Sequence, residues 1–397
     1  MAAHLPVHPG RSWTEGSWAV TMADEMTTPW TDGWLVRPSA RTWRCPSPST
    51  AARAFHASLP SYAVTALVEV PALAGRWGVG AVLVKDESSR LGLPAFKVLG
   101  ASWAVARLVG EGAGLDLEDL RLDRLRAVAG QAPVTLVTAT DGNHGRALAR
   151  VGTWLGLPVE VVVPAVISRR AETAIAAEGA RVTRIAGSYD EAVAAAAELA
   201  DQMPSAVLVQ DMGWNGYEVV PGWIVEGYQT LLSELDDQLA DLRLGGPDML
   251  AVPVGVGSLA QAVVAYARGR SDDAWVRVLA CEPDTAACVL ASLSAGNPVS
   301  VATGATVMAG LNCGTPSSLA WPVLRNGLDA AVAVSEGAAI TAVAALADYG
   351  VQAGASGAAA LAGATACLDD PARRAELDLR NDAVVVLLNT EGADGAA

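Results

Sequence analysis

The amino-acid sequence predicts an α/β protein built on open, mostly parallel sheets. Short apolar runs alternate along the chain with Ala- and Leu-rich stretches that have the period of a helix. The runs are apolar along their whole length, which is typical of strands buried on both faces. Strands of this kind, separated by helices, define the open α/β class.

Each apolar run bounded by turn residues is expected to form a strand. In chain order these are residues 81–85, 134–138, 159–164, 206–210, 249–254, 276–280 and 383–388. Helical patterns lie between them, among them residues 101–109, 168–178, 189–200 and 217–232. Ligands of such sheets bind at the carboxyl ends of the strands, so the loops that follow the strands are where functional residues are expected.

Residues 1–50 differ in composition from the rest and are expected to form an extension of loops and short strands on the body of the protein. They are rich in Pro, Ser, Thr and Trp. They contain no basic start followed by an apolar segment, so no secretory signal is expected. Five scattered cysteines without a C-x-x-C spacing fit a reducing compartment, which predicts a cytoplasmic protein.

Composition also excludes several classes of partner. The chain of 397 residues has a net charge of −15 and no basic cluster, which argues against nucleic acid. Its longest uncharged segments are rich in Gly and Ala, so no membrane span is expected. Four histidines and no paired cysteines predict no metal site. We therefore expect a small-molecule partner.

Lysine is rare, and only Lys85 and Lys97 could supply a side-chain amine for catalysis. Lys97 follows a strand and a polar turn and begins a helix. The helix dipole disfavours a cation at this end, so a desolvated Lys97 is expected to have a lowered pKa that suits Schiff-base chemistry. The alternative for Lys97 is a solvated surface lysine. Lys85, next to two acidic residues at a strand end, is interpreted as structural.

The loop after the second expected strand, residues 138–146, carries Asp141, Gly142, Asn143, His144 and Gly145 before another helix begins. Its backbone N–H groups and the helix start could bind a carboxylate or a phosphate, with the Asn143 amide as a further donor. The alternative is an ordinary Asx turn with a helix N-cap. His144 is interpreted either as a proton relay or as a hydrogen-bonding support for neighbouring groups.

A glycine loop follows the fifth expected strand and opens a helix. It consists of Gly255, Val256, Gly257, Ser258 and Leu259. Consecutive N–H groups of such a loop bind phosphate, and the Ser258 hydroxyl could add a contact. The loop lacks the third glycine of the dinucleotide pattern, because Ala260 stands there, and no Walker lysine follows.

Two further strand ends carry polar groups. Thr390 and Glu391 follow the last strand, and Asp211 follows the fourth. Asp211 alone could be an N-cap or a catalytic base. Together the sequence offers an amine, a carboxylate-binding turn, a phosphate-binding loop and a hydroxyl at a strand end. Pyridoxal phosphate needs this set for covalent attachment, substrate anchoring, phosphate docking and a partner for its ring nitrogen.

From about Phe55 to Gly392 the chain resembles the diaminopropionate ammonia-lyase family, which belongs to the fold-type II pyridoxal-phosphate enzymes and is similar to tryptophan synthase β. The stretches that carry this resemblance are residues 55–65, 85–88, 95–102, 141–145, 210–221, 281–284, 308–314 and 389–392. The aspartate of Asp141-Gly-Asn-His-Gly145 is the most diagnostic, since related dehydratases and racemases usually have serine there. The family's glutamate in a later Gly-Glu-Ser-Gly loop is replaced by Ala355.

The resemblance implies a fold with two twisted sheets flanked by helices and the cofactor between two domains. Residues 51–98 and 210–397 would form the large, cofactor-binding domain, residues 99–209 the small domain, and residues 1–50 an extension. A homodimer is also implied. The implied catalytic residues are Lys97, which forms the Schiff base, and the acid/base groups Asp141 and Asp211. The implied cofactor contacts are Lys97, Asn143, Gly255, Val256, Gly257, Ser258, Leu259 and Thr390, and the implied substrate contacts are Asp141, Gly142, Asn143, His144 and Gly145.

The implied reaction is elimination of ammonia from D- or L-2,3-diaminopropionate, which gives pyruvate and two molecules of ammonia. Asp141 would serve the D enantiomer and Asp211 the L enantiomer. Two alternatives are a β-replacement synthase or related lyase that acts on another β-substituted amino acid, and a cofactor-binding protein that acts by interaction.

Overall fold

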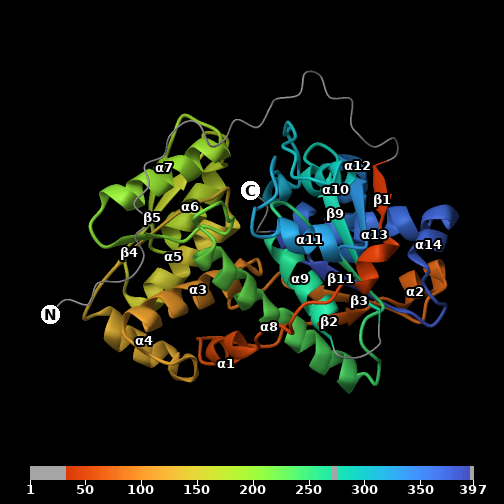
Figure 1. Cartoon of the computed structure of the whole chain (residues 1–397), viewed down its shortest axis with the longest axis horizontal. Coiled ribbons are helices and arrows are strands. Elements are labelled where there is room, and N and C mark those ends of the chain that lie inside the picture. Colours follow the sequence, from red (N-terminus) through yellow and green to blue (C-terminus); the bar gives the residue numbers. More distant parts are fainter. Residues whose placement is uncertain (1–32, 271–274, 394–397) are drawn as a thin grey trace.

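A computed structural model describes residues 33–270 and 275–393 of the chain, which form two sheets flanked by helices (Figure 1). The larger sheet has the order β1-β10-β9-β8-β11-β3-β2. Its strands are β1 (Trp34–Val36), β10 (Ala330–Val334), β9 (Arg277–Pro283), β8 (Met249–Pro253), β11 (Val384–Asn389), β3 (Ala81–Asp86) and β2 (Leu67–Glu69). Only the two edge strands, β1 and β2, pair antiparallel. The buried centre of the sheet is therefore parallel.

The smaller sheet is parallel throughout and has the order β6-β5-β4-β7. Its strands are β6 (Arg181–Arg184), β5 (Val159–Val163), β4 (Thr135–Ala139) and β7 (Ala206–Leu208). It lies on the left of Figure 1 with the yellow and green helices, and the larger sheet lies on the right. The two sheets confirm the predicted fold class, whereas the exact domain boundaries stay a prediction.

The helices that carry site residues are α3 (Lys97–Gly112), α5 (Asn143–Leu155), α7 (Tyr189–Gln202), α9 (Ser258–Gly269) and α13 (Ala355–Leu368). The long helix α8 (Val219–Asp241) packs along α3. The others are α1 (Ala51–His56), α2 (Pro71–Trp77), α4 (Leu122–Ala129), α6 (Arg169–Ala177), α10 (Cys288–Ala295), α11 (Trp321–Gly327), α12 (Glu336–Asp348) and α14 (Pro371–Leu377), with 3-10 turns at Pro38–Thr42, Leu117–Asp119 and Ala309–Leu311. In this part of the chain no helix is long and apolar enough to cross a membrane.

Two glycines let α3 and α8 approach closely. A Cβ atom at Gly227 would lie 2.5 Å from the backbone oxygen of Leu99, and one at Gly100 would lie 2.6 Å from side-chain atoms of Ile224 and Tyr228. Any larger residue would force the helices apart. Since Lys97 begins α3, this contact helps to hold the lysine in place.

All the strands expected from apolar runs are present, with ends shifted by a few residues. The strands missed were β1, β2, β6 and β10. β1 and β2 are short edge strands, β6 has the polar sequence Arg181-Val-Thr-Arg184, and β10 is rich in alanine. The N-terminal extension contributes β1, which pairs with β10 through Trp34 and Val332, while residues 1–32 lie outside the described part.

Candidate active site

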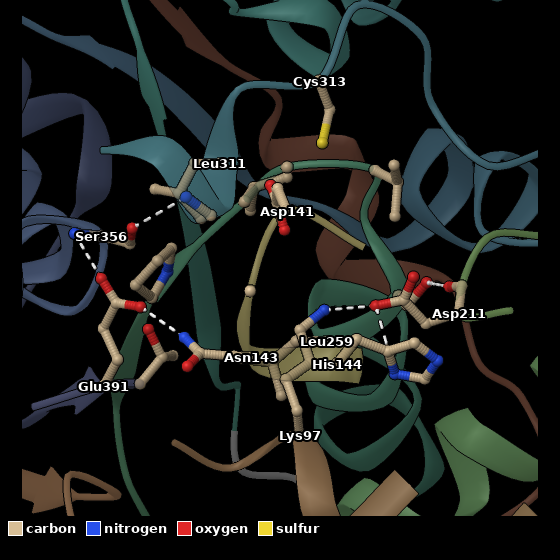
Figure 2. A pocket seen from close by; sticks show the side chains of 18 of the residues that line it. Lys97, Asp141, Asn143, His144, Asp211, Leu259, Leu311, Cys313, Ser356 and Glu391 are labelled. Carbon is tan, nitrogen blue, oxygen red and sulfur yellow. Dashed lines mark hydrogen bonds and ion pairs between the residues drawn. The ribbon is translucent and has the colours of Figure 1, made fainter. Parts of the chain in front are cut away.

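A pocket at the carboxyl ends of strands from both sheets gathers the predicted site residues (Figure 2). Lys97 comes from the start of α3, Asp141 and Asn143 from the loop after β4, Asp211 from the segment after β7, and Thr390 from the end of β11. The glycine loop after β8 also lines it. Of the predicted site residues, Gly145 alone is not a lining residue; it packs behind the loop against Thr140.

Lys97 and Asp211 form an ion pair inside the pocket. The Nζ atom of Lys97 donates to Oδ2 of Asp211 at 2.5 Å, and the two side chains are only 22% and 8% exposed. Burial is the largest single effect and lowers the pKa of Lys97, but Asp211, helped by Tyr228 and Asp141, raises the pKa well above its usual value. The expectation of a lowered lysine pKa is therefore wrong for this state of the protein, because a carboxylate faces the amine.

The two aspartates of the pocket have different electrostatic surroundings. Burial raises the pKa of Asp141 to about 6, and attraction by Lys97 offsets only part of the effect. Burial also favours a raised pKa for Asp211, but the nearby positive charge of Lys97 lowers the pKa of Asp211 to about 2. Asp211 is therefore ionised at neutral pH, and Asp141 titrates close to neutrality. Neither is an N-cap: α8 begins several residues after Asp211, and Gly142 precedes α5.

His144 is held as a neutral ring beside Asp211. Its Nε2 lies 2.8 Å from the backbone oxygen of Val209, which can only accept, so Nε2 carries the hydrogen. Burial lowers the pKa of the ring. Its Nδ1 is buried without a hydrogen-bond partner in the described structure and lies 3.9 Å from Oδ2 of Asp211. The arrangement favours the supporting role weighed for this residue.

The loop after β4 is shaped by Thr140, which sequence reasoning did not single out. The Oγ1 atom of Thr140 accepts from the N–H groups of Gly142 at 3.0 Å and of Gly145 at 3.1 Å. The N–H groups of Asn143 and His144 have no acceptor in residues 33–270 and 275–393. Because both belong to the first turn of α5, they are free donors at a helix N-terminus, where an anionic group binds favourably.

The glycine loop presents a row of free backbone donors. In the described ranges, none of the N–H groups from Gly255 to Leu259 finds an oxygen acceptor; the Val256 N–H group interacts with the Cys313 thiol. Gly257 has a φ of 97°, a left-handed conformation that favours glycine. The Ser258 hydroxyl donates at 2.6 Å to the backbone oxygen of Asp211, so its hydrogen links this loop to the segment after β7 and is not free for a ligand. A row of N–H donors at the start of α9 fits a phosphate group.

Thr390 and Asn143 lie at another side of the same pocket. The hydroxyl of Thr390 makes no hydrogen bond to any described residue, so it is available to a ligand. The Asn143 amide donates to Glu391 at 2.7 Å, which leaves its second Nδ2 hydrogen free. A neutral hydroxyl and an amide donor fit the ring nitrogen and the ring hydroxyl of pyridoxal phosphate.

Several lining residues were missed by sequence reasoning. Tyr189 lines the pocket from the start of α7, and its hydroxyl accepts from the Gln210 amide at 2.9 Å. It follows β6, so recognising that strand would have drawn attention to its loop. Leu311 and Cys313 come from an irregular segment around the turn Ala309–Leu311, which has no periodic pattern.

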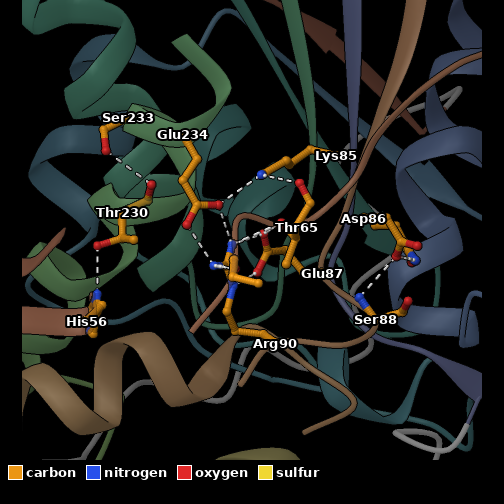
Figure 3. Close-up of polar contacts among 12 residues, drawn as sticks. His56, Thr65, Lys85, Asp86, Glu87, Ser88, Arg90, Thr230, Ser233 and Glu234 are labelled. Carbon is orange, nitrogen blue, oxygen red and sulfur yellow. Dashed lines mark hydrogen bonds and ion pairs between the residues drawn. The ribbon is translucent and has the colours of Figure 1, made fainter. Parts of the chain in front are cut away.

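The other lysine lies in a different, buried cluster (Figure 3). The Nζ atom of Lys85 donates to Glu234 at 2.9 Å, to the side chain of Gln238 at 2.9 Å and to the backbone oxygen of Thr65 at 3.0 Å. Its side chain is fully buried and does not line the pocket. The structural interpretation of Lys85 is therefore confirmed.

These residues fit pyridoxal phosphate in every part: an amine at Lys97, free N–H donors for the phosphate, and a hydroxyl and an amide for the ring. A family model for pyridoxal-phosphate dependent enzymes matches residues 59–391. The fold and the site thus define a fold-type II pyridoxal-phosphate enzyme, with pyridoxal phosphate as its cofactor.

Comparison with known proteins narrows the family. The diaminopropionate ammonia-lyase of Escherichia coli strain K12 is 35% identical over 350 residues, which are 86% of this chain and 87% of that protein. The enzyme of the same name from Salmonella typhimurium strain LT2 is 36% identical over 280 residues, or 69% of each chain. The chain therefore belongs to the diaminopropionate ammonia-lyase family and is a pyridoxal-phosphate dependent ammonia-lyase.

Solved structures agree with this assignment. The holo form of diaminopropionate ammonia lyase from Escherichia coli superposes with a TM-score of 0.82 and 32% identity, and the match covers 92% of this chain and 95% of that one. The serine racemase of maize has a TM-score of 0.68 at 20% identity, and the match covers 88% of this chain and 94% of that one. At that lower identity the likeness supports the fold alone.

Proposed function

We propose that the protein eliminates ammonia from 2,3-diaminopropionate, in both the D and L forms. The first product, 2-aminoacrylate, hydrolyses after release to pyruvate and a second ammonia. One observation carries the proposal beyond the names of the relatives: two carboxylates, the half-buried Asp141 and the buried Asp211, line the pocket of a single reactive amine, Lys97. Two separate bases are what an enzyme needs to remove the Cα proton from either enantiomer.

The residues of the chain hold the reactants in defined places. Pyridoxal phosphate, when bound, supplies an electron-withdrawing ring that acidifies the Cα–H bond of an attached amino acid. The N–H groups from Gly255 to Leu259 bind its phosphate, and Asn143 donates to its ring hydroxyl. The free N–H groups of Asn143 and His144 bind the α-carboxylate of the substrate. Thr390 offers a neutral hydroxyl to the ring nitrogen, which favours prompt loss of the β-amine over racemisation.

Proton transfer is assigned to the two aspartates. Once the substrate has displaced Lys97 from the cofactor, the lysine again faces Asp211 and keeps it ionised, so Asp211 can accept the Cα proton of the L substrate over a wide pH range. Asp141 has a pKa raised by burial to about 6, close to working pH, which suits a base that must also release its proton. His144, held through Nε2 by the backbone oxygen of Val209, lies beside Asp211 and limits the space in which this carboxylate can move.

Enantiomer-resolved product analysis tests the function. The purified holoenzyme is incubated with D- or L-2,3-diaminopropionate, and pyruvate and ammonia are measured with and without a thiol or amine acceptor. The proposal expects pyruvate from both enantiomers, two ammonia per pyruvate, and no effect of the acceptor. If the acceptor adds to 2-aminoacrylate and less pyruvate is formed, the protein is a β-replacement synthase instead. Absence of turnover with any β-substituted amino acid indicates a binding protein.

A homodimer in the cytoplasm completes the proposal. The family resemblance supports the dimer. All five cysteines, Cys45, Cys281, Cys288, Cys313 and Cys367, are unpaired, which supports a reducing compartment. Light scattering of the protein as it elutes from a size-exclusion column tests the oligomeric state, since a mass near 40.6 kDa would indicate a monomer.

A further inference from the structure

Glu391 is a buried carboxylate of the pocket to which the mechanism above gives no role. It follows Thr390 at the end of β11, and its side chain points toward Asn143 and Ser356 in Figure 2. The residue is only 4% exposed. A carboxyl group buried to this extent requires hydrogen-bond or charged partners, and the identity of these partners indicates its role.

The backbone around Glu391 is fixed from two sides. The segment before Lys97 pairs with it, since Phe96 donates to the backbone oxygen of Thr390 at 3.3 Å and Gly392 donates to that of Pro94 at 2.9 Å. On the other side, the N–H group of Gly354 donates to the backbone oxygen of Glu391 at 2.9 Å. The carboxylate is thus held between the lysine segment and the start of α13.

The side chain of Glu391 accepts two hydrogen bonds. Its Oε2 accepts from Nδ2 of Asn143 at 2.7 Å, and its Oε1 accepts from the N–H group of Ser356 at 3.2 Å. Ser356 is in the first turn of α13, where the helix dipole favours a negative charge.

Burial raises the pKa of Glu391, but the hydrogen bonds from Ser356 and Asn143 favour its ionised form. An ionised carboxylate can only accept hydrogen bonds, and this decides how the Asn143 amide is turned. With Nδ2 toward Glu391, one of its hydrogens is used and the other stays free for the pocket. The flipped amide would bring Oδ1 against the carboxylate, and two acceptors at 2.7 Å repel each other. Glu391 therefore excludes the orientation in which Asn143 would offer Oδ1 in place of this N–H donor.

We propose that Glu391 is a positioning residue that orients the Asn143 amide so that an N–H hydrogen faces the ring hydroxyl oxygen of the cofactor. The inference rests on the cofactor contact of Asn143 given under the proposed function. Glu391 acts through Asn143 and touches neither the substrate nor the reacting atoms. Its removal should consequently weaken cofactor binding and change the absorption of the bound cofactor only while Asn143 is present.

A double-mutant cycle with Glu391→Gln and Asn143→Ala tests this on the full chain. Apoprotein is titrated with pyridoxal phosphate, and the dissociation constant and the absorbance maximum of the bound cofactor are recorded. A glutamine turns an amide N–H toward one of the two donors, so Asn143 loses its fixed orientation. We expect Glu391→Gln to weaken binding by roughly tenfold and to shift the absorbance maximum. In the Asn143→Ala background the same change should alter binding by less than about twofold.

Two results would overturn the inference. One is a Glu391→Gln variant with unchanged affinity and spectrum, and the other is an equal effect of Glu391→Gln with and without Asn143, which indicates a structural role. If Glu391→Gln does not fold, Glu391→Asp serves in the same cycle, because it keeps the charge but withdraws it from Asn143. These titrations use no substrate, so failure to release pyruvate from diaminopropionate would refute the proposed function and leave this test intact.

Discussion

The Nζ atom of Lys97 lies 2.5 Å from Oδ2 of Asp211, so the predicted nucleophile and one predicted base hold each other ionised in the free enzyme. The contact raises the pKa of the lysine and lowers that of the aspartate to about 2. Covalent attachment of the cofactor requires an unprotonated amine. The lysine must therefore lose a proton as the cofactor attaches, and the ion pair then breaks.

Replacement of Asp211 should make attachment of the cofactor possible at lower pH. In Asp211→Asn the strongest effect that raises the pKa of Lys97 is gone, so burial, opposed by the weaker effects of Tyr228 and Asp141, brings this pKa down. The measurement is the rate at which apoprotein gains the absorbance of bound cofactor, as a function of pH. In Asp211→Asn this rate should stay at its high-pH value down to a lower pH than in the wild type. An unchanged pH profile would mean that Asp211 does not control the lysine.

Lys97→Ala should abolish the visible absorbance of covalently bound cofactor, because no other amine among the described residues lines the pocket. Lys85→Met is the matched control. Lys85 lies in the buried cluster of Figure 3, so its variant should lose stability and yet keep the absorbance while folded. Circular dichroism checks that both variants are folded at the temperature used. The opposite pattern of absorbance would assign the Schiff base to Lys85.

Asp141→Asn and Asp211→Asn should impair opposite enantiomers. A general base contributes about 10²- to 10⁴-fold to a rate, so each variant is expected to lose this much kcat on one enantiomer of diaminopropionate and much less on the other. The measurement is kcat for pyruvate release from the D and L forms by both variants. Equal losses on both enantiomers would contradict the assignment of separate bases.

The two enantiomers should also differ in pH dependence. Asp141, with a pKa raised by burial to about 6, accepts a proton only when ionised, so turnover of the D substrate should fall as pH decreases through about 6. Asp211 has a pKa of about 2 when the Lys97 ammonium faces it, as it does once the substrate has displaced the lysine from the cofactor, so kcat for the L substrate should persist. Parallel pH profiles of kcat on the acid side would count against this difference.

Much of the site could be predicted because parallel sheets put their strand ends at one place. The loops that hold Asp141, Asp211, Gly257 and Thr390 each follow an apolar run that the sequence makes obvious. The scarcity of lysine then limited the nucleophile to two residues, and the helix start selected Lys97. The resemblance to a known family added the roles of the two aspartates.

What could not be predicted depends on contacts between distant segments. The pKa of Lys97 was expected to fall because nothing local indicates that Asp211, 114 residues away, faces the amine. Tyr189 was missed because β6, the strand before it, is largely polar and exposed. The role of Glu391 depends on Asn143, 248 residues earlier in the chain. Periodicity reports which residues are buried, but not which polar groups meet.

The buried cluster around Glu234 predicts a large effect on stability far from the chemistry. Glu234 is fully buried and accepts from Lys85 at 2.9 Å and from Arg90 at 2.7 Å. Glu234→Gln leaves the two buried cations with Glu87 as their shared carboxylate, so one buried positive charge is uncompensated and the free energy of unfolding should fall by about 3–5 kcal/mol. Glu226→Gln is the control on the same helix, because Glu226 is half-exposed, pairs with Arg107 and should cost about 1 kcal/mol or less. Urea unfolding of both variants decides the point, and equal losses would show that the buried cluster does not stabilise the fold more than a surface pair.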